Sequence, residues 1–236
     1  LAEPQRVIAF RSLDSTTRDS SSGGAAYALG ELVISHGGAV VACAFDEEGT
    51  ARHVVAKDEK ALRAMQGSKY VQSDARMGYR ALGDLLEDGR EVLFIGTPCQ
   101  VYAVRSLYPD ENLLVTCDLV CHGVPSPGYW RRELEWSNAK GRLLNRSAVM
   151  FRSSNHHSRT KFELYCRHAS RGHISQDRDP YFATFVENAS LRESCYKCPF
   201  ARGERVGDIT LGDCASYNEH LDFHPYEPIS TLTANT

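Results

Sequence analysis

Apolar runs alternate with amphipathic stretches along the chain, and their periods predict a mixture of helices and strands. The run EVLFIG, at 91–96, is almost continuously apolar, which is typical of a strand buried on both faces. QVYAVRSLY, at 100–108, has a helical period, and NLLVTCDLV, at 112–120, is a second buried strand. Strand, helix and strand in so short a span predict a parallel βαβ unit at the centre of the fold.

The pattern adds further elements on both sides of this unit. Helices are predicted at 25–36, 58–66, 75–89, 128–140 and 179–190. Strands are predicted at 39–45, 51–57, 147–152, 161–168 and 208–213. We expect Ser22 to cap the first helix and Gly89 to end the third. The fold class is therefore α/β or α+β, with a mixed sheet around the central βαβ unit, flanking helices and a Cys-rich, irregular C-terminal segment, as a single domain over 1–236.

Composition and charge exclude several classes of function. The 236 residues are 42% hydrophobic, which is enough apolar material to bury a sizeable core. A formal net charge of -3 argues against a nucleic-acid module, which normally has a basic excess. No apolar run reaches the roughly 20 residues of a membrane span, and the first residues lack a secretory signal. The first residue is not Met, so we expect a fragment of a longer chain.

Cysteine is the residue type that carries most of the candidate chemistry. In a chain large enough to build its own core, eight cysteines indicate metal ligation or thiol chemistry in a reducing cytoplasm rather than a disulfide scaffold. Three of them lie within apolar strands and are expected to be small buried hydrophobes, namely Cys43, Cys117 and Cys166.

Two other pairs of cysteines are candidates for one shared site. Cys99 follows the first strand of the βαβ unit and Cys121 follows the second. Parallel strands end at the same edge of a sheet, where such folds bind ligands. Cys195 and Cys198 form a Cys-x-x-Cys pair, a spacing found in zinc sites, iron–sulfur sites and redox dithiols. Four thiolates from three loops are suited to zinc or to a 4Fe–4S cluster.

Six phrases of the sequence together resemble one known family. In order they are SSSGGAAYALGE, GSKYVQS, GTPCQVYAVRSL, CDLVCHGVPSP, SCYKCPF and GDITLGD. They are similar to the coenzyme F-420 hydrogenase/dehydrogenase beta-subunit family, from about residue 4 to residue 220. The resemblance implies a cytoplasmic iron–sulfur flavoprotein, with FAD or FMN as its flavin and coenzyme F-420 as one candidate substrate. It also implies that a 4Fe–4S cluster is held by Cys99, Cys121, Cys195 and Cys198.

The flavin contacts implied by the resemblance fall in three places. Ser-Ser-Gly-Gly precedes a helix start, where free N–H groups suit a phosphate, and an ordinary helix cap is the alternative. Gly-Ser-Lys-Tyr offers a cation and an aromatic ring to a phosphate or a flavin ring, and a solvated turn is the alternative. A hydroxyl at a strand end either reaches the flavin edge or caps the next helix. The candidates are Ser21, Ser22, Gly23, Gly24, Gly67, Ser68, Lys69, Tyr70 and Thr97.

One histidine is a candidate catalytic residue, and two departures from the family pattern are visible. His122 follows Cys121, so it is placed either to protonate a reduced flavin or substrate, or to cap backbone groups. Family members often carry a ferredoxin-like segment ahead of the region matched here, and we expect this chain to lack it. Cys214 stands where an aromatic residue is expected after Gly-Asp.

These features predict an oxidoreductase that passes electrons between a flavin, a cluster and a small redox substrate, a redox partner protein or a ferredoxin-like domain. Two alternatives belong to other classes. One is an interaction module in which the same four cysteines hold structural zinc. The other is a transferase with Cys99 as nucleophile and His122 as base.

Overall fold

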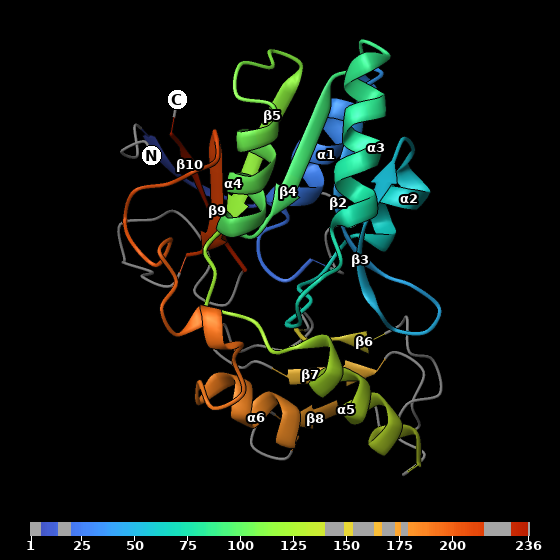
Figure 1. The fold of residues 1–236 in the computed structure, drawn as a ribbon, viewed down its shortest axis with the longest axis vertical. Coiled ribbons are helices and arrows are strands. Elements are labelled where there is room, and N and C mark those ends of the chain that lie inside the picture. The colour runs from blue at the N-terminus through green and yellow to red at the C-terminus, as the bar shows by residue number, and fades with distance from the viewer. Residues whose placement is uncertain are drawn as a thin grey trace.

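A seven-stranded mixed sheet organises the larger part of the molecule (Figure 1). The computed structural model describes residues 6–13, 20–139, 149–152, 163–166, 173–175, 179–214 and 228–235. The strands lie in the order β1–β10–β9–β5–β4–β2–β3. Their bounds are β1 Arg6–Phe10, β2 Ala39–Phe45, β3 Ala51–Ala56, β4 Val92–Gly96, β5 Leu114–Leu119, β9 Ile209–Asp213 and β10 Ser230–Ala234.

The centre of this sheet is parallel. β2, β4, β5 and β9 run in the same direction, and the pairing of β4 with β5 extends from Val92↔Leu114 to Gly96↔Asp118. Helix α4 (Pro98–Leu107) connects β4 to β5 and completes the predicted βαβ unit. β1, β3 and β10 add antiparallel pairs at the two sides. The predicted α/β fold with a mixed sheet is confirmed.

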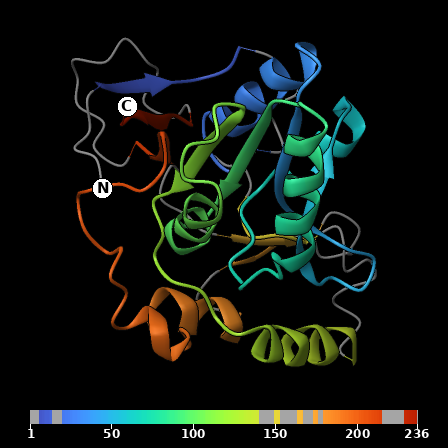
Figure 2. The same cartoon turned by 45° about the horizontal axis from the view of Figure 1, so that its top comes forward.

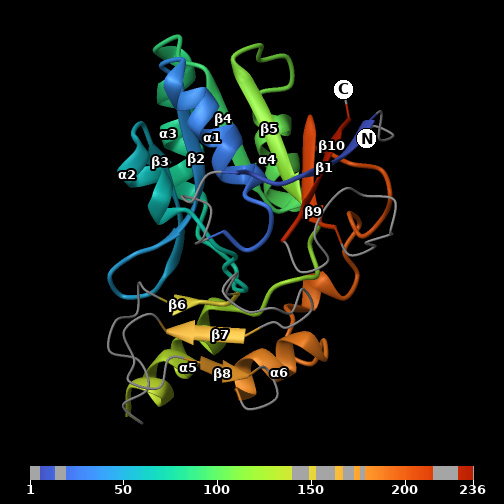
Figure 3. The ribbon, with the colours of Figure 1, turned by 180° about the vertical axis from the view of Figure 1, so that it is seen from behind.

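Helices cover both faces of the sheet, which explains the continuous apolar runs of its strands. The side chains of Leu93 and Ile95 on β4 belong to the core beneath α1 and α2. Those of Val92 and Phe94 belong to the core beneath α3 and α4, on the opposite face (Figures 1 and 3). A strand buried on both sides has no polar face to show in its sequence. The remaining helices of this layer are α1 Ala25–Ser35, α2 Glu59–Ala64 and α3 Arg76–Glu87.

A second, smaller sheet lies beyond the edge at which β4 and β5 end (Figures 1 and 3). It consists of three antiparallel strands, β6 Val149–Met150, β7 Glu163–Cys166 and β8 His173–Ser175. Helices α5 (Pro127–Ala139) and α6 (Pro180–Val186) accompany it. Its core is aromatic, and Trp130, Tyr181 and Phe182 pack together with at most 2% of each residue exposed.

Most predicted elements are present, with differences at their ends. The N-cap of α1 is Gly24 and not Ser22, and the φ of +85° at Gly24 is a conformation that a side chain disfavours. The Ser22 hydroxyl instead donates to the Ile229 carbonyl, at 2.7 Å. Gly89, with a φ of +72°, follows the end of α3 as predicted. The pattern missed β1, β8 and β10.

The Cys-rich segment is largely irregular, as predicted, and runs along the outside of the molecule from α6 to β9 (Figure 2). It contains one short 3₁₀ helix, η3 (Glu193–Cys195). Of the cysteines expected to be buried, Cys117 is fully buried and Cys43 is half-buried, while the side chain of Cys166 lies outside the described residues. No helix in the described part of the chain is long and apolar enough to cross a bilayer.

Candidate functional site

The topology of the sheet places two of the candidate cysteines at one edge. β4 ends at Gly96 and Cys99 lies in the first turn of α4, whereas β5 ends at Leu119 and Cys121 follows two residues later. Because the parallel register pairs Gly96 with Asp118, both cysteines lie beyond the same edge of the sheet. Each residue as a whole is exposed, although the surroundings of the Cys121 thiol are buried enough to raise its pKa.

A second loop is fixed against the one that carries Cys121. The Arg192 N–H donates to the Val124 carbonyl at 3.0 Å, and Pro125 forms an isolated bridge with Leu191. These contacts bring η3, and with it Cys195, beside the turn at Gly123. The two loops are joined by backbone groups, so their approach does not depend on the thiols themselves.

Gly123 lies between the two loops and makes their close approach sterically feasible. Its φ is +108°, a conformation that residues with a side chain rarely adopt. A Cβ atom at this position would stand 2.8 Å from Leu191 Cδ1 and 3.3 Å from Cys195 Cβ. The Gly123 N–H also points at Cys121 Sγ, at 3.4 Å, and lowers the pKa of that thiol. Gly123 thus allows the two loops to pack closely, and its N–H stabilises negative charge on Cys121.

The four candidate cysteines are close enough to interact electrostatically. Burial raises the pKa of Cys121 to about 11, and negative charge on three neighbours contributes to the rise: Cys99, Cys195 and Cys198. If all four were deprotonated they would repel one another, and a bound cation would stabilise that state. Strand topology predicts the approach of Cys99 and Cys121, whereas the resemblance to the family implies that Cys195 and Cys198 join them.

The spacing of these thiols bears on what they can hold. Among the described residues, no three His, Cys, Asp or Glu side chains lie close enough together to bind a single metal ion. Zinc requires every sulfur within about 2.3 Å of the same atom. In a 4Fe–4S cluster each thiolate binds a different iron, so the sulfurs stand further apart. Among the described residues, the four thiols therefore do not surround a single metal-ion position in this structure.

Cys99 is embedded in a network of polar side chains. Thr97, the N-cap of α4, has its Oγ1 atom 3.2 Å from Cys99 Sγ and 3.0 Å from Gln100 Oε1. Burial of Tyr79 raises the pKa of its hydroxyl to about 12, and the negative charge of Cys99 contributes to this rise. Thr97 thus caps α4, which is one of the two roles that its sequence position left open, and its hydroxyl also lies beside Cys99.

His122 lies near the cysteines and points toward an aromatic stack. Its ring meets Phe185 edge-on at 5.0 Å, and Phe185 stacks on Tyr70 at 4.8 Å. Within the described residues no hydrogen bond joins His122 to Cys99. This geometry does not favour the alternative in which His122 is the base for a Cys99 nucleophile.

The structure brings two of the predicted flavin segments together. Ser21 Oγ accepts hydrogen bonds from the Ser68 N–H and hydroxyl, at 2.6 and 2.9 Å. Gly67, with a φ of +79°, provides the turn that aims Ser68 at Ser21. The two segments, 47 positions apart in sequence, therefore form one wall at the start of α1.

The start of α1 is suited to an anion, whereas two neighbouring candidates are used by the fold itself. The N-cap of α1 is Gly24, which has no side chain to accept from the first-turn N–H groups, and such a helix start can bind a phosphate. Gly23 packs under the sheet, since a Cβ there would stand 2.2 Å from the Phe10 carbonyl oxygen. The three Nζ protons of Lys69 are directed to the carbonyls of Met65, Gln66 and Gly67, at 2.7–2.9 Å.

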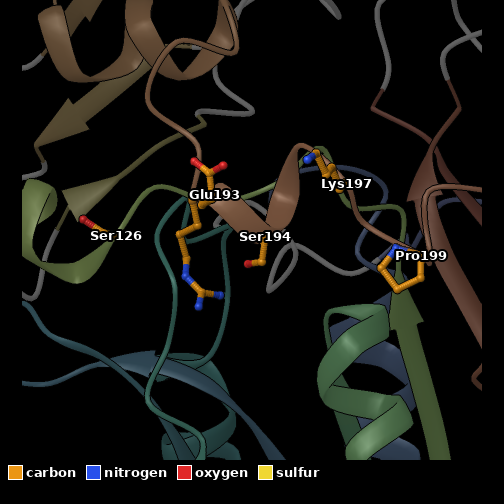
Figure 4. A pocket seen from close by; sticks show the side chains of 6 residues that line it. Ser126, Glu193, Ser194, Lys197 and Pro199 are labelled. Atoms are coloured by element: carbon orange, nitrogen blue, oxygen red, sulfur yellow. The ribbon is translucent and has the colours of Figure 1, made fainter.

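An open depression adjoins the Cys-x-x-Cys turn, and the sequence did not predict it (Figure 4). It has a volume of about 740 Å³ and lies between the loop before α5 and the turn around η3. Its lining residues are Ser126, Arg192, Glu193, Ser194, Lys197 and Pro199. The only sign of these residues in the sequence is that Arg192 precedes Cys195 and Lys197 follows it, and basic residues near a cysteine are too common to indicate a binding site.

A comparison with known families identifies the class of protein that has this fold and this sheet edge. Residues 89–236, more than half of the chain, match the family described as the C terminus of the beta subunit of coenzyme F420 hydrogenase/dehydrogenase. The chain belongs to this family, and it is an oxidoreductase of the beta-subunit type. No curated protein matches the sequence.

Among solved structures, the fold is similar to a chain of the F420-reducing [NiFe] hydrogenase complex from Methanosarcina barkeri. The TM-score is 0.68 at 18% sequence identity, and the match covers 100% of this chain and 76% of that chain. At this identity the likeness concerns the fold. It supports the mixed α/β architecture derived above.

Proposed function

We propose that residues 1–236 form an iron–sulfur flavoprotein that passes electrons between a flavin, a 4Fe–4S cluster and a coenzyme F-420-like or other reducible substrate or partner protein. The convergence of four thiols at the sheet edge is the observation that carries this proposal. The family description names coenzyme F420, and the similar structure is part of a hydrogenase complex, which supports the substrate class and the expectation of partner proteins.

In this proposal Cys99, Cys121, Cys195 and Cys198 hold the cluster. When both groups are bound, the flavin supplies two-electron hydride chemistry and the cluster supplies one-electron transfer. The chain's own contribution is to fix the thiolates by the β4–β5 register and by the backbone contacts of η3. The Gly123 N–H stabilises negative charge on Cys121, a type of contact that tunes cluster potentials.

The flavin is proposed to lie at the start of α1, with its phosphate on the first-turn N–H groups after Gly24. Ser21 and Ser68 shape the wall beside it, and Ser22 and Gly23 hold that wall against β10 and β1. Lys69 fixes the Gly67 turn through its three carbonyl contacts, and Thr97 lies at the strand end near Cys99.

The stacked rings of Tyr70, Phe185 and His122 are proposed to connect the flavin wall at Ser21 and Ser68 with the cysteine loops. Tyr70 lies in the Gly67 turn and connects through Phe185 to His122. His122 is then a candidate proton donor for a reduced substrate, because its exposed imidazole directly follows Cys121, a proposed cluster ligand.

Anaerobic purification with analysis of iron, sulfide and flavin tests the proposal. We expect iron, sulfide and a broad absorption shoulder near about 400 nm, and we expect Cys99→Ser and Cys195→Ser each to lose most of the iron. Cys43→Ala is the matched control, because its half-buried thiol is outside the four. A colourless protein that contains zinc would refute the cluster and support the zinc-binding interaction module instead. Full iron content in Cys99→Ser would refute the assignment of Cys99 as a ligand.

A further inference from the structure

A series of hydrogen-bonded polar side chains connects the buried residue His53 on β3 to Cys99. His53 on β3 is 2% exposed and stacks on Phe94 at 5.2 Å. Its Nδ1 atom lies 3.1 Å from Ser73 Oγ, and Ser73 Oγ lies 2.9 Å from Gln100 Nε2. Gln100 contacts Thr97, and Thr97 contacts Cys99 Sγ. None of the three inner residues is a candidate ligand of the cluster or the flavin.

The donors and acceptors of this chain can have only one direction. His53 Nε2 faces the Ile95 carbonyl oxygen at 3.1 Å and must donate to it, because a carbonyl only accepts. Burial lowers the pKa of His53 to about 4, so the ring is neutral at pH 7 and its Nδ1 accepts from the Ser73 hydroxyl. Ser73 Oγ is then left to accept from the Gln100 amide nitrogen.

This direction also fixes the amide of Gln100. With its nitrogen held by Ser73, its Oε1 atom faces Thr97 and accepts from the Thr97 N–H at 3.1 Å. The Thr97 hydroxyl, 3.0 Å from the same oxygen and 3.2 Å from Cys99 Sγ, has one proton for two acceptors. A cluster-bound Cys99 is a thiolate and attracts that proton, since charged acceptors form the stronger bonds.

We propose that Thr97 donates a hydrogen bond to the Cys99 thiolate, and that Gln100, Ser73 and His53 are positioning residues which set the strength of that bond by competing for the same proton. The inference rests on the proposed role of Cys99 as a cluster ligand. A hydrogen bond to a ligand sulfur stabilises the more negative, reduced cluster and makes its potential more positive. Removal of the donor and removal of the competing acceptor therefore have opposite effects.

The test is a redox titration of the cluster in anaerobically purified variants, with iron content measured on the same samples. We expect Thr97→Val to shift the potential to more negative values, and Thr97→Ser, which keeps the hydroxyl, to restore the wild-type value. Gln100→Met removes the competing oxygen and shifts the potential to more positive values. Ser73→Ala releases the amide without touching Thr97 or Cys99, and we expect a smaller shift in the same positive direction.

Each outcome decides for or against the inference. Opposite signs for Thr97→Val and Gln100→Met support it, because general loosening of the site would move both variants alike. Equal potentials in Thr97→Val and Thr97→Ser, with iron retained, overturn it and leave the proposed function intact. If Thr97→Val does not retain iron, the signs of Gln100→Met and Ser73→Ala decide, and a negative shift in both overturns it. Iron-free wild-type protein would overturn the proposed function and this inference together.

Discussion

Gly123 is the position at which a single methyl group should separate the two cysteine loops. Its φ of +108° costs a residue with a side chain about 1–2 kcal/mol. The new Cβ would also stand 3.3 Å from Cys195 Cβ and 2.8 Å from Leu191 Cδ1, and overpacking of this kind costs about 1–3 kcal/mol. Leu191 can move away at its flexible end, so we take about 2 kcal/mol in total for Gly123→Ala. If the cysteine loops bear this cost, the cluster is retained roughly 30-fold less tightly.

The assay compares iron loss to a chelator in Gly123→Ala and in a matched variant. Gly203→Ala is the control, because Gly203 lies in the same Cys-rich segment and a Cβ there meets nothing within 4 Å. We expect Gly203→Ala to lose iron at the wild-type rate and Gly123→Ala to lose it much faster. Adding Leu191→Ala to Gly123→Ala removes the nearest overlap and should recover part of the difference.

The reasoning is refuted if Gly123→Ala and Gly203→Ala release iron at the same rate. Denaturant unfolding of both iron-free variants separates a local effect from a global one. Since Gly123 connects loops at the edge of the fold, we expect the midpoint of Gly123→Ala to fall by much less than its retention of iron. Similar losses in both measurements would place the strain in the folded core rather than in the site.

Two further predictions concern the buried histidine and the start of α1. Because burial lowers the pKa of His53 from 6.5 to about 4, the unfolded state takes up the proton first as the pH falls. Stability should drop by ~3 kcal/mol as the pH falls from about 7 to about 4, with little of this loss above pH 6.5, and His53→Gln should lose this contribution in urea unfolding at a series of pH values. At the start of α1, a carboxylate favours the helix dipole and repels a phosphate. Ala26→Asp should therefore release the flavin while its matched amide, Ala26→Asn, retains it, as measured by the flavin content of purified protein; equal contents would contradict a phosphate site there.

The central part of the fold follows directly from the sequence, whereas its edges do not. β4 and β5 are visible as apolar runs because helices bury both of their faces. β1 and β10 pair residues from opposite ends of the chain, as in Arg6↔Ala234, and their short, mixed sequences carry no strong period. Register over such a distance depends on tertiary packing, which a local pattern does not contain.

The candidate site divides in the same way. Cys99 and Cys121 could be placed at one sheet edge from topology alone, because the ends of parallel strands coincide. The approach of Cys195 could not, since it depends on a left-handed glycine and on a backbone hydrogen bond between Arg192 and Val124. The chain from His53 to Thr97 was equally invisible, because Ser73 and Gln100 are ordinary polar residues until the fold brings them together.

The two proposed cofactor sites rest on different parts of the chain, and this makes them separable. All four cysteines lie in the region that matches the family, which begins at residue 89. Ser21 to Gly24 and Gly67 to Tyr70, which form the proposed flavin wall, lie before it and are joined to each other by Ser21 and Ser68. Replacing Ser21 by Ala should therefore lower flavin content without removing iron. Loss of iron in Ser21→Ala would show that the wall and the cysteine loops form one cooperative unit, with Tyr70, Phe185 and His122 as the contacts that connect them.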